Sequence, residues 1–251
     1  MVVSGSGAPL VWITRPQPGA DKTAAALADA GYNFLVLPLT EIVAFDPEID
    51  PGDIERADFV VATSANAFRF LPEPLLAALA DKPVYAVGDA TRAEALARGF
   101  VHVRSADGAV DDLVSLVSRA EPVSARFVYL CGKVRTGDLE HKLVGSGFEG
   151  GLAIVYSSKI VSRMTYLLTD ALSHRRPDAI LFHSALSARA FADAVSTKTE
   201  DLFENTRFIA ISARVADALP DTFRPRVMVA TAPNEHALLE ALRATVPSSG
   251  A

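Results

Sequence analysis

Short apolar runs alternate along this chain with alanine-rich segments whose apolar residues recur at helical spacing. Parallel strands need a long crossover between them, usually a helix, and strands that are covered on both faces are apolar throughout. This order therefore favours parallel sheets with helices on both faces. The apolar runs are 10–13, 59–62, 84–87, 101–103, 127–131, 180–182, 208–211 and 227–229, and the helical segments after them are 20–30, 65–70, 91–98, 110–120, 139–144, 185–195, 215–219 and 235–244.

Two extended segments, 34–44 and 152–161, interrupt the alternation because no helix follows them directly. A strand of about ten residues spans roughly 33 Å, which is enough to leave one lobe and enter another. At 251 residues the chain is also near the size at which one core divides into two. We predict an α/β fold of two lobes with parallel sheets joined by a two-stranded linker: lobe 1 is 1–38 with 162–251, lobe 2 is 46–154, and the linker strands are 39–45 and 155–161.

An internal repeat indicates that the two lobes are similar. Ser64 and Ser184 each end an apolar strand and precede an alanine-rich helix, at an offset of 120 residues (184 − 64). Gly88 and Ser212 occupy a second matched turn, at an offset of 124 residues (212 − 88). Sheets of this kind bind ligands at the carboxyl ends of their strands. We therefore expect the carboxyl ends of both sheets to share one binding cleft.

The turns from strand to helix hold the candidate binding residues. A helix start has unpaired backbone N–H groups and about half a positive charge, so it can bind a carboxylate or a phosphate. Small hydroxyl residues at such positions also cap helices, and capping alone is the alternative for Ser64, Thr91 and Ser184. The candidates in these turns are Arg15, Thr63, Ser64, Ala65, Asn66, Gly88, Thr91, Gly132, Lys133 and Ser184.

Composition excludes several classes of function. The formal net charge of −6 argues against nucleic-acid binding, and no apolar run is long enough to span a membrane. The one cysteine, Cys131, rules out an internal disulfide and ends an apolar strand, where a thiol is more often core than nucleophile. The start lacks the pattern of a signal peptide. We expect a cytoplasmic protein that acts as a monomer.

Three further motifs have ordinary explanations. The glycines at 145, 147 and 150 follow a helix and lead into a strand, which is the reverse of the dinucleotide-binding order. The acidic segment 46–53 has Pro51 where a calcium loop needs glycine, so we interpret it as a solvated loop. The five histidines have no metal-ligand spacing, and we predict no metal. His183 ends a strand, where ligand contact and simple packing are both open.

The segments 11–16, 37–42, 62–67, 86–91 and 155–158, together with the Ser184 turn, resemble the uroporphyrinogen-III synthase family in order and spacing. The resemblance implies two flavodoxin-like lobes joined by a two-stranded ladder, the first lobe being discontinuous. It also implies the reaction: hydroxymethylbilane, a linear tetrapyrrole with eight carboxylates, is cyclised with loss of water and inversion of ring D to uroporphyrinogen III. No cofactor is implied.

The resemblance also implies roles for residues. Tyr156 occupies the position of the family's tyrosine, and a phenol can give a proton to the departing hydroxyl while staying neutral at pH 7. The alternative is a linker tyrosine with a structural hydrogen bond. The cations expected to meet substrate carboxylates are Arg15, Lys133, Arg135 and Lys159.

This chain departs from the family at 211–216, where a glycine and two hydroxyl residues are missing. Arg214 can replace them as a carboxylate clamp, because its planar guanidinium binds carboxylate with two hydrogen bonds; otherwise the site has drifted. The departure motivates an alternative function, a non-catalytic tetrapyrrole binder or regulator on the same fold. A two-lobed small-ligand receptor and a nucleotide-dependent oxidoreductase are less favoured, because a signal peptide and a correctly placed glycine motif are missing.

Overall fold

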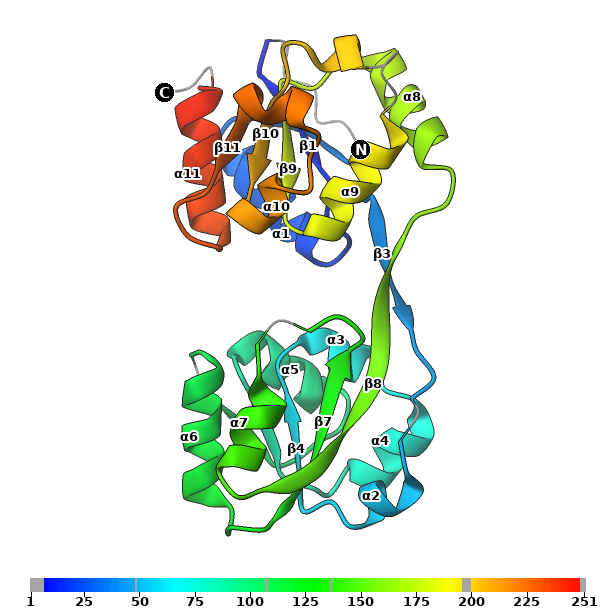
Figure 1. Cartoon of the computed structure of the whole chain (residues 1–251), viewed down its shortest axis with the longest axis vertical. Helices are drawn as coiled ribbons and strands as arrows, with labels where there is room; N and C mark the ends of the chain where they lie inside the picture. Colours follow the sequence, from blue (N-terminus) through cyan, green and yellow to red (C-terminus); the bar gives the residue numbers. More distant parts are fainter. Residues whose placement is uncertain (1–6, 48, 107, 136, 196–199, 249–251) are drawn as a thin grey trace. The chain divides into compact units, whose positions relative to one another are not determined.

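A computed structural model describes residues 7–47, 49–106, 108–135, 137–195 and 200–248. The chain forms two compact units (Figure 1). Unit 1 consists of Met1–Glu41 and Lys159–Ala251, and unit 2 of Ile42–Ser158. The chain passes between the units inside the segments 39–45 and 155–161. The sheet of unit 1 is parallel throughout, and the sheet of unit 2 is parallel except for one pair of strands at its edge. The predicted α/β class with parallel sheets is confirmed.

Unit 1 contains a five-stranded parallel sheet in the order β11-β10-β9-β1-β2. Each strand is short, and in the central strands both faces are covered by helices, which explains their unbroken apolar sequences. The strands are β1 (Leu10–Ile13), β2 (Asn33–Val36), β9 (Ala179–Phe182), β10 (Arg207–Ala210) and β11 (Val227–Val229), and the helices are α1 (Gly19–Asp29), α8 (Met164–His174), α9 (Ala185–Ala194), α10 (Ala213–Ala216) and α11 (Glu235–Thr245).

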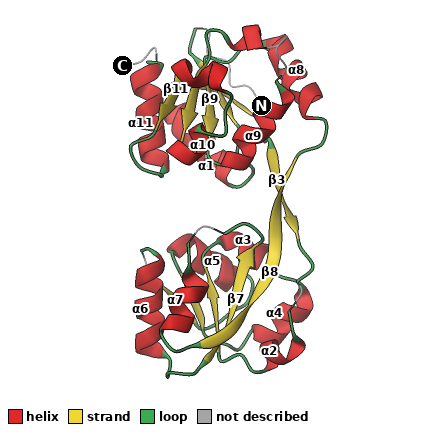
Figure 2. Ribbon diagram, viewed as in Figure 1, coloured by secondary structure: helices red, strands yellow, loops and turns green. Residues whose placement is uncertain are grey.

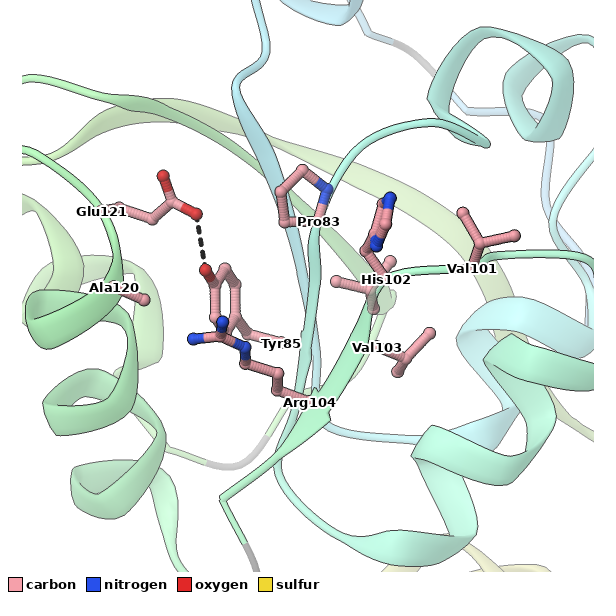
Figure 3. A pocket seen from close by; sticks show the side chains of 9 residues that line it. Pro83, Tyr85, Val101, His102, Val103, Arg104, Ala120 and Glu121 are labelled. Carbon is pink, nitrogen blue, oxygen red and sulfur yellow. Dashed lines mark hydrogen bonds between the residues drawn. The ribbon is translucent and has the colours of Figure 1, made fainter.

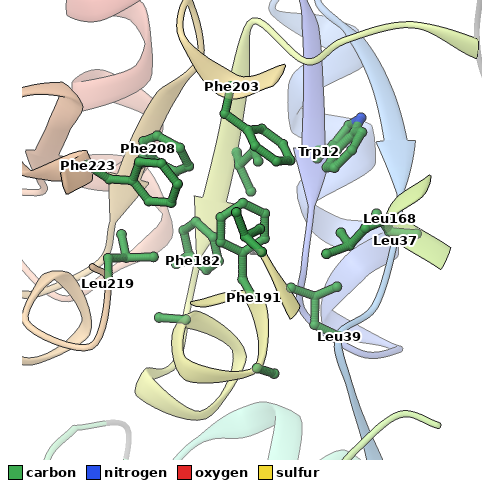
Figure 4. Packing of buried hydrophobic residues seen from close by; sticks show 14 of the residues in the cluster. Trp12, Leu37, Leu39, Leu168, Phe182, Phe191, Phe203, Phe208, Leu219 and Phe223 are labelled. Atoms are coloured by element: carbon green, nitrogen blue, oxygen red, sulfur yellow. The ribbon is translucent and has the colours of Figure 1, made fainter. Parts of the chain in front are cut away.

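Alternate residues of β1 serve the two faces of this sheet. Trp12 lies in the cluster formed with α8, α9 and α10, whereas Val11 and Ile13 pack with α1 and α11. Two 3₁₀-helices, Glu200–Phe203 and Asp221–Arg226, add aromatic rings to the first cluster. Figure 4 shows these rings close together, and the Phe208 and Phe223 centroids are 4.6 Å apart in a stacked arrangement. The aromatic cluster packs the two 3₁₀-helices and α9 against the central strands β1, β9 and β10.

Unit 2 contains a six-stranded sheet in the order β3-β8-β7-β4-β5-β6. Buried side chains of α2 to α5 form a hydrophobic cluster on one face of the sheet, and those of α6 and α7 form another on the other face. Figure 2 draws these helices in red and the strands in yellow. The strands are β3 (Thr40–Ala44), β4 (Phe59–Ala62), β5 (Val84–Ala86), β6 (Val103–Ser105), β7 (Arg126–Gly132) and β8 (Glu149–Ile160), and the helices are α2 (Pro51–Glu55), α3 (Ala65–Arg69), α4 (Glu73–Leu79), α5 (Asp89–Ala97), α6 (Val110–Ala120) and α7 (Leu139–Gly145).

Strands β3 and β8 form the ladder between the units. The Phe45 N–H donates to the Val155 carbonyl at 2.9 Å, and the Val161 N–H donates to the Leu39 carbonyl at 3.2 Å. Residue numbers rise along one strand while they fall along the other, which is the antiparallel arrangement. β8 is twelve residues long and also pairs in parallel with β7.

Several details differ from the sequence-based expectations. The segment 34–44 is not one extended strand: β2 ends at Val36 and β3 begins at Thr40, with the buried Leu37 and Leu39 on either side of a proline. The interpretation of 46–53 as a solvated loop holds for the described residues before Pro51 and was wrong from there on, because α2 begins at Pro51. Asp50 caps this helix by accepting from the Gly52 N–H at 2.8 Å, while Glu48 lies outside the described residues. The strand predicted at 101–103 lies at Val103–Ser105.

Candidate functional site

The turn after β4 begins α3 at the carboxyl edge of the unit 2 sheet. Ser64 is the N-cap, and its hydroxyl accepts from the Asn66 N–H at 3.3 Å. The Thr63 hydroxyl lies 3.0 Å from the Tyr129 hydroxyl. Thr63, Ser64, Ala65 and Asn66 are all half-buried. Capping therefore accounts for the Ser64 hydroxyl, while the turn itself remains partly open.

The turn after β5 places its two predicted residues differently. Gly88 is the N-cap of α5, and a side chain there would meet nothing within 4 Å, so the space beside this turn is open. Thr91 is the third residue of that helix and only 5% exposed. Its backbone N–H donates to the Gly88 carbonyl at 3.0 Å. Thr91 does not cap the helix, and its side chain packs inside unit 2.

The ends of β7 and β8 bring four predicted residues together. The Lys133 N–H donates to the Tyr156 carbonyl at 2.9 Å, and Arg135 Nη1 donates to the Gly132 carbonyl at 3.4 Å. A Cβ on Gly132 would lie 2.7 Å from two ring carbons of Tyr156, so this ring packs directly on the glycine. Lys133 and Arg135 are exposed and form no ion pair with the described residues. We call Gly132, Lys133, Arg135 and Tyr156 the β7–β8 cluster.

The hydroxyl of Tyr156 makes no hydrogen bond within the described part of the chain. The alternative of a linker tyrosine with a structural hydrogen bond therefore has no support among these residues. Its ring is half-buried and lies 6.4 Å from the ring of Phe70. Beneath the cluster, burial raises the pKa of Tyr129 and raises the pKa of Cys131 to about 11. The Cys131 thiol is therefore protonated at neutral pH, as expected for a core residue.

At the carboxyl edge of the unit 1 sheet, Arg15 is already paired. Its Nη1 lies 2.9 Å from Glu235 Oε2, and the same oxygen lies 3.1 Å from His183 Nε2. The Thr23 hydroxyl donates to the other carboxylate oxygen at 2.6 Å. We call Arg15, Thr23, His183 and Glu235 the Glu235 network. Glu235 and Thr23 were missed by the sequence analysis, although an acidic residue directly after the Asn234 N-cap was a visible signal.

Burial and charge set the protonation of this network. Burial lowers the pKa of His183, and the Arg15 charge lowers it further, so the imidazole is neutral at pH 7. Burial tends to raise the pKa of Glu235, but the hydrogen bonds from His183 and Thr23 and the nearby charges hold it below its usual value. A carboxylate beside a neutral imidazole accepts a hydrogen bond from the nearer ring nitrogen, which must therefore carry the proton. His183 therefore donates through Nε2–H.

The remaining predicted residues lie apart from these groups. Ser184 caps α9 by accepting from the Ser187 N–H at 3.1 Å. Arg214 is exposed on α10, and Lys159 is exposed on β8. Among the described residues, neither has an ion-pair partner. The expectation that the strand ends of both units share one cleft stays a prediction.

A cavity of about 450 Å³ lies elsewhere, where β5 and β6 begin (Figure 3). The Tyr85 hydroxyl donates to Glu121 Oε1 at 2.5 Å at its wall, and Arg104 and His102 also line it. None of the residues predicted from the sequence lines this cavity. Over the residues that the structure describes, no group of three or more His, Cys, Asp or Glu side chains is arranged to hold a metal ion. No described helix has the length and apolar character needed to cross a membrane.

Comparison with known proteins identifies the family. Residues 21–240 match the family model described as uroporphyrinogen-III synthase HemD. Uroporphyrinogen-III synthetase from Helicobacter pylori 26695 has a similar fold, with a TM-score of 0.58 and 20% identity over 94% of this chain and 98% of that one. A mutant uroporphyrinogen III synthase from the extremely thermophilic bacterium Thermus thermophilus gives a TM-score of 0.50 and 17% identity over 95% and 98%. A search of curated protein sequences found no significant match. Because the family model covers most of its length, the chain belongs to the uroporphyrinogen-III synthase family.

Proposed function

We propose that the chain converts hydroxymethylbilane into uroporphyrinogen III, as a lyase that needs no cofactor and acts as a monomer in the cytoplasm. The match of residues 21–240 to the synthase family carries the cyclising activity and the substrate class. The linear substrate can close by itself to the uninverted isomer, so the enzyme must hold the chain in one geometry until ring D has inverted. Binding and orientation are therefore the main tasks of the site.

The chemistry of the turns fits an octacarboxylate. The exposed Lys133 and Arg135 have no carboxylate partner among the described residues, and the open turn at Gly88 presents backbone N–H groups at the start of a nine-residue helix. Fixed donors of this kind stabilise anionic groups without reorganising. We assign substrate carboxylates to these groups first, to the half-buried turn 63–66 next, and to Arg15, Ser184 and Arg214 in unit 1. The side chain of Thr91 is buried, so we assign it a supporting role at the Gly88 turn and no substrate carboxylate.

Tyr156 is the proposed proton donor. Its hydroxyl makes no hydrogen bond with the described residues, and Tyr156 belongs to the β7–β8 cluster with Lys133 and Arg135. In the proposed step its proton passes to the terminal hydroxyl of the substrate, the C–O bond breaks and water leaves. The proton is returned when the ring carbon that forms the new bond loses its own, so the cyclisation consumes no net proton. A positioned general acid contributes roughly 10²- to 10⁴-fold to a rate.

Product analysis tests the proposal. The purified chain is supplied with enzymatically generated hydroxymethylbilane, and the type I and type III isomers are separated. A synthase gives the type III isomer, whereas a non-catalytic tetrapyrrole binder gives only the type I isomer that forms spontaneously. In the same assay, Tyr156→Phe is expected to lower turnover while its circular dichroism stays that of the wild type. Unchanged turnover would remove the catalytic role of Tyr156.

A further inference from the structure

Glu235 is a shared acceptor at the strand-end edge of unit 1. Three side chains from different parts of the chain donate to its carboxylate: Thr23 from α1 at 2.6 Å, Arg15 after β1 at 2.9 Å, and His183 after β9 at 3.1 Å. Thr23 is fully buried, and the His183 side chain is only 7% exposed. The carboxylate therefore fixes the relative positions of a strand end, a helix and a second strand end.

Arg15 is held on a second side by the backbone of α1. A Cβ on Gly19 would lie 2.3 Å from Arg15 Nε and 2.6 Å from Nη2, so the guanidinium occupies the space that a side chain would fill. Nη1 is used by Glu235 and Thr23. Nε–H and Nη2–H make no hydrogen bond with the described residues, and the Arg15 side chain is 32% exposed. The network thus leaves two donors of a fixed guanidinium unused.

A fixed guanidinium binds a carboxylate better than a mobile one. A free arginine side chain has rotamer entropy to lose when a ligand orders it. An arginine that its neighbours already hold has lost this entropy on folding, so ligand binding does not reduce it again. The value of Glu235 to binding would then be orientation rather than charge, since its negative charge alone repels a carboxylate.

We propose that Glu235 is a positioning residue, which together with Gly19 holds the Arg15 guanidinium so that Nε–H and Nη2–H receive a carboxylate of the substrate. The inference rests on the proposed synthase function. The hydrogen bonds from His183 and Thr23 partly compensate the negative charge of Glu235 and so reduce its repulsion of the incoming carboxylate. Glu235 does not touch the substrate; it acts through Arg15.

Kinetics of three variants test the role. Glu235→Gln keeps the size of the side chain and removes its charge, and Gly19→Ala pushes Arg15 aside without changing any charge. Both are expected to raise KM for hydroxymethylbilane about tenfold, the effect of one hydrogen bond to a charged group, with little change in kcat. Glu240→Gln is the matched control, because Glu240 lies on the same helix and pairs only with the exposed His236 among the described residues. Its KM is expected to equal that of the wild type.

The sign of the change separates two explanations. If Glu235 merely competes with substrate carboxylates for Arg15, Glu235→Gln lowers KM, and that result overturns the proposal. A wild-type KM in both Glu235→Gln and Gly19→Ala overturns it as well. Loss of kcat in both variants without a change in KM would assign the network to the chemical step and also contradict positioning.

Nitrogen-15 NMR of the His183 ring gives a readout that needs no activity. The wild type is expected to carry its proton on Nε2. Glu235 raises the pKa of His183 and Arg15 lowers it, so Glu235→Gln should lower that pKa and Gly19→Ala should raise it. Equal shifts in both variants would show that the network is not arranged as described. If the wild type makes no type III isomer, the proposed function fails while this measurement still tests the network.

Discussion

Gly132→Ala tests whether the position of the Tyr156 ring controls turnover. The added Cβ would lie 2.7 Å from Cε2 and Cζ of the ring and 3.0 Å from its hydroxyl oxygen. Carbon atoms in contact are normally about 3.7 Å apart, so the ring must move by about 1 Å. The half-buried ring can move in this way, because it is not enclosed on all sides. The substitution therefore displaces the proposed proton donor and leaves its chemistry intact.

The expected loss is about 100-fold in kcat. A misplacement of about 1 Å in a reacting group can cost this factor, which corresponds to about 2.7 kcal/mol of transition-state stabilisation. The assay is the initial rate of type III isomer formation at saturating substrate. Gly145→Ala is the control, because a Cβ there would meet nothing within 4 Å.

A double-variant cycle decides whether both changes act through the same hydroxyl. If Gly132 matters because it positions Tyr156, Gly132→Ala combined with Tyr156→Phe loses no more activity than the more damaging single variant. Losses that multiply would show that Gly132 acts separately, for example through its own backbone. A wild-type rate for Gly132→Ala would refute the reasoning from ring position altogether.

Two further predictions concern stability. Gly150→Ala places a Cβ 2.2 Å from the backbone oxygen of Phe127, which cannot rotate away as a side chain can. The free energy of unfolding, measured by urea titration, should therefore fall by about 2 kcal/mol. The control Gly145→Ala should change it by less than about 0.5 kcal/mol, and equal changes in the two variants would contradict this prediction. The pKa values of His183 and Glu235 in the folded chain lie below their ordinary 6.5 and 4.5, so the unfolded chain binds more protons at low pH. The free energy of unfolding should therefore fall as the pH drops below about 6.5, and fall further below about 4.5. If a His183→Gln variant loses as much stability as the wild type between pH 7 and 5.5, the role given to His183 is refuted.

The strands and most helices were predictable because burial on both faces leaves a simple pattern. The runs 10–13 and 59–62 are strands with these bounds, and every residue of both is apolar and buried. The helix Pro51–Glu55 was missed because acidic residues dominate its segment, although an aspartate before a proline is a helix-start signal. The helix Met164–His174 was missed because it follows a linker strand, outside the repeating order.

The candidate site was predictable only in part. Sequence order places residues at strand ends, but it does not show which distant side chain fills the space beside them. Arg15 and Glu235 are 220 positions apart, so nothing local in the sequence indicated that this arginine has a partner. Thr91 illustrates a second limit: the turn at Gly88 was located correctly, yet helical rotation directs a residue three positions later into the core.

The pairing of Arg15 separates it from the other cations predicted to meet the substrate. Lys133, Arg135, Lys159 and Arg214 are exposed and have no carboxylate partner among the described residues. Their charges therefore attract an anion in solution, but salt largely screens this attraction beyond about 8 Å at physiological ionic strength. Arg15 and Glu235 together carry no net charge, so Arg15 attracts little at a distance and contributes through fixed geometry. A chain with a net charge of −6 can therefore bind an octacarboxylate by local groups, with exposed cations for attraction and one guanidinium held by Glu235 for orientation.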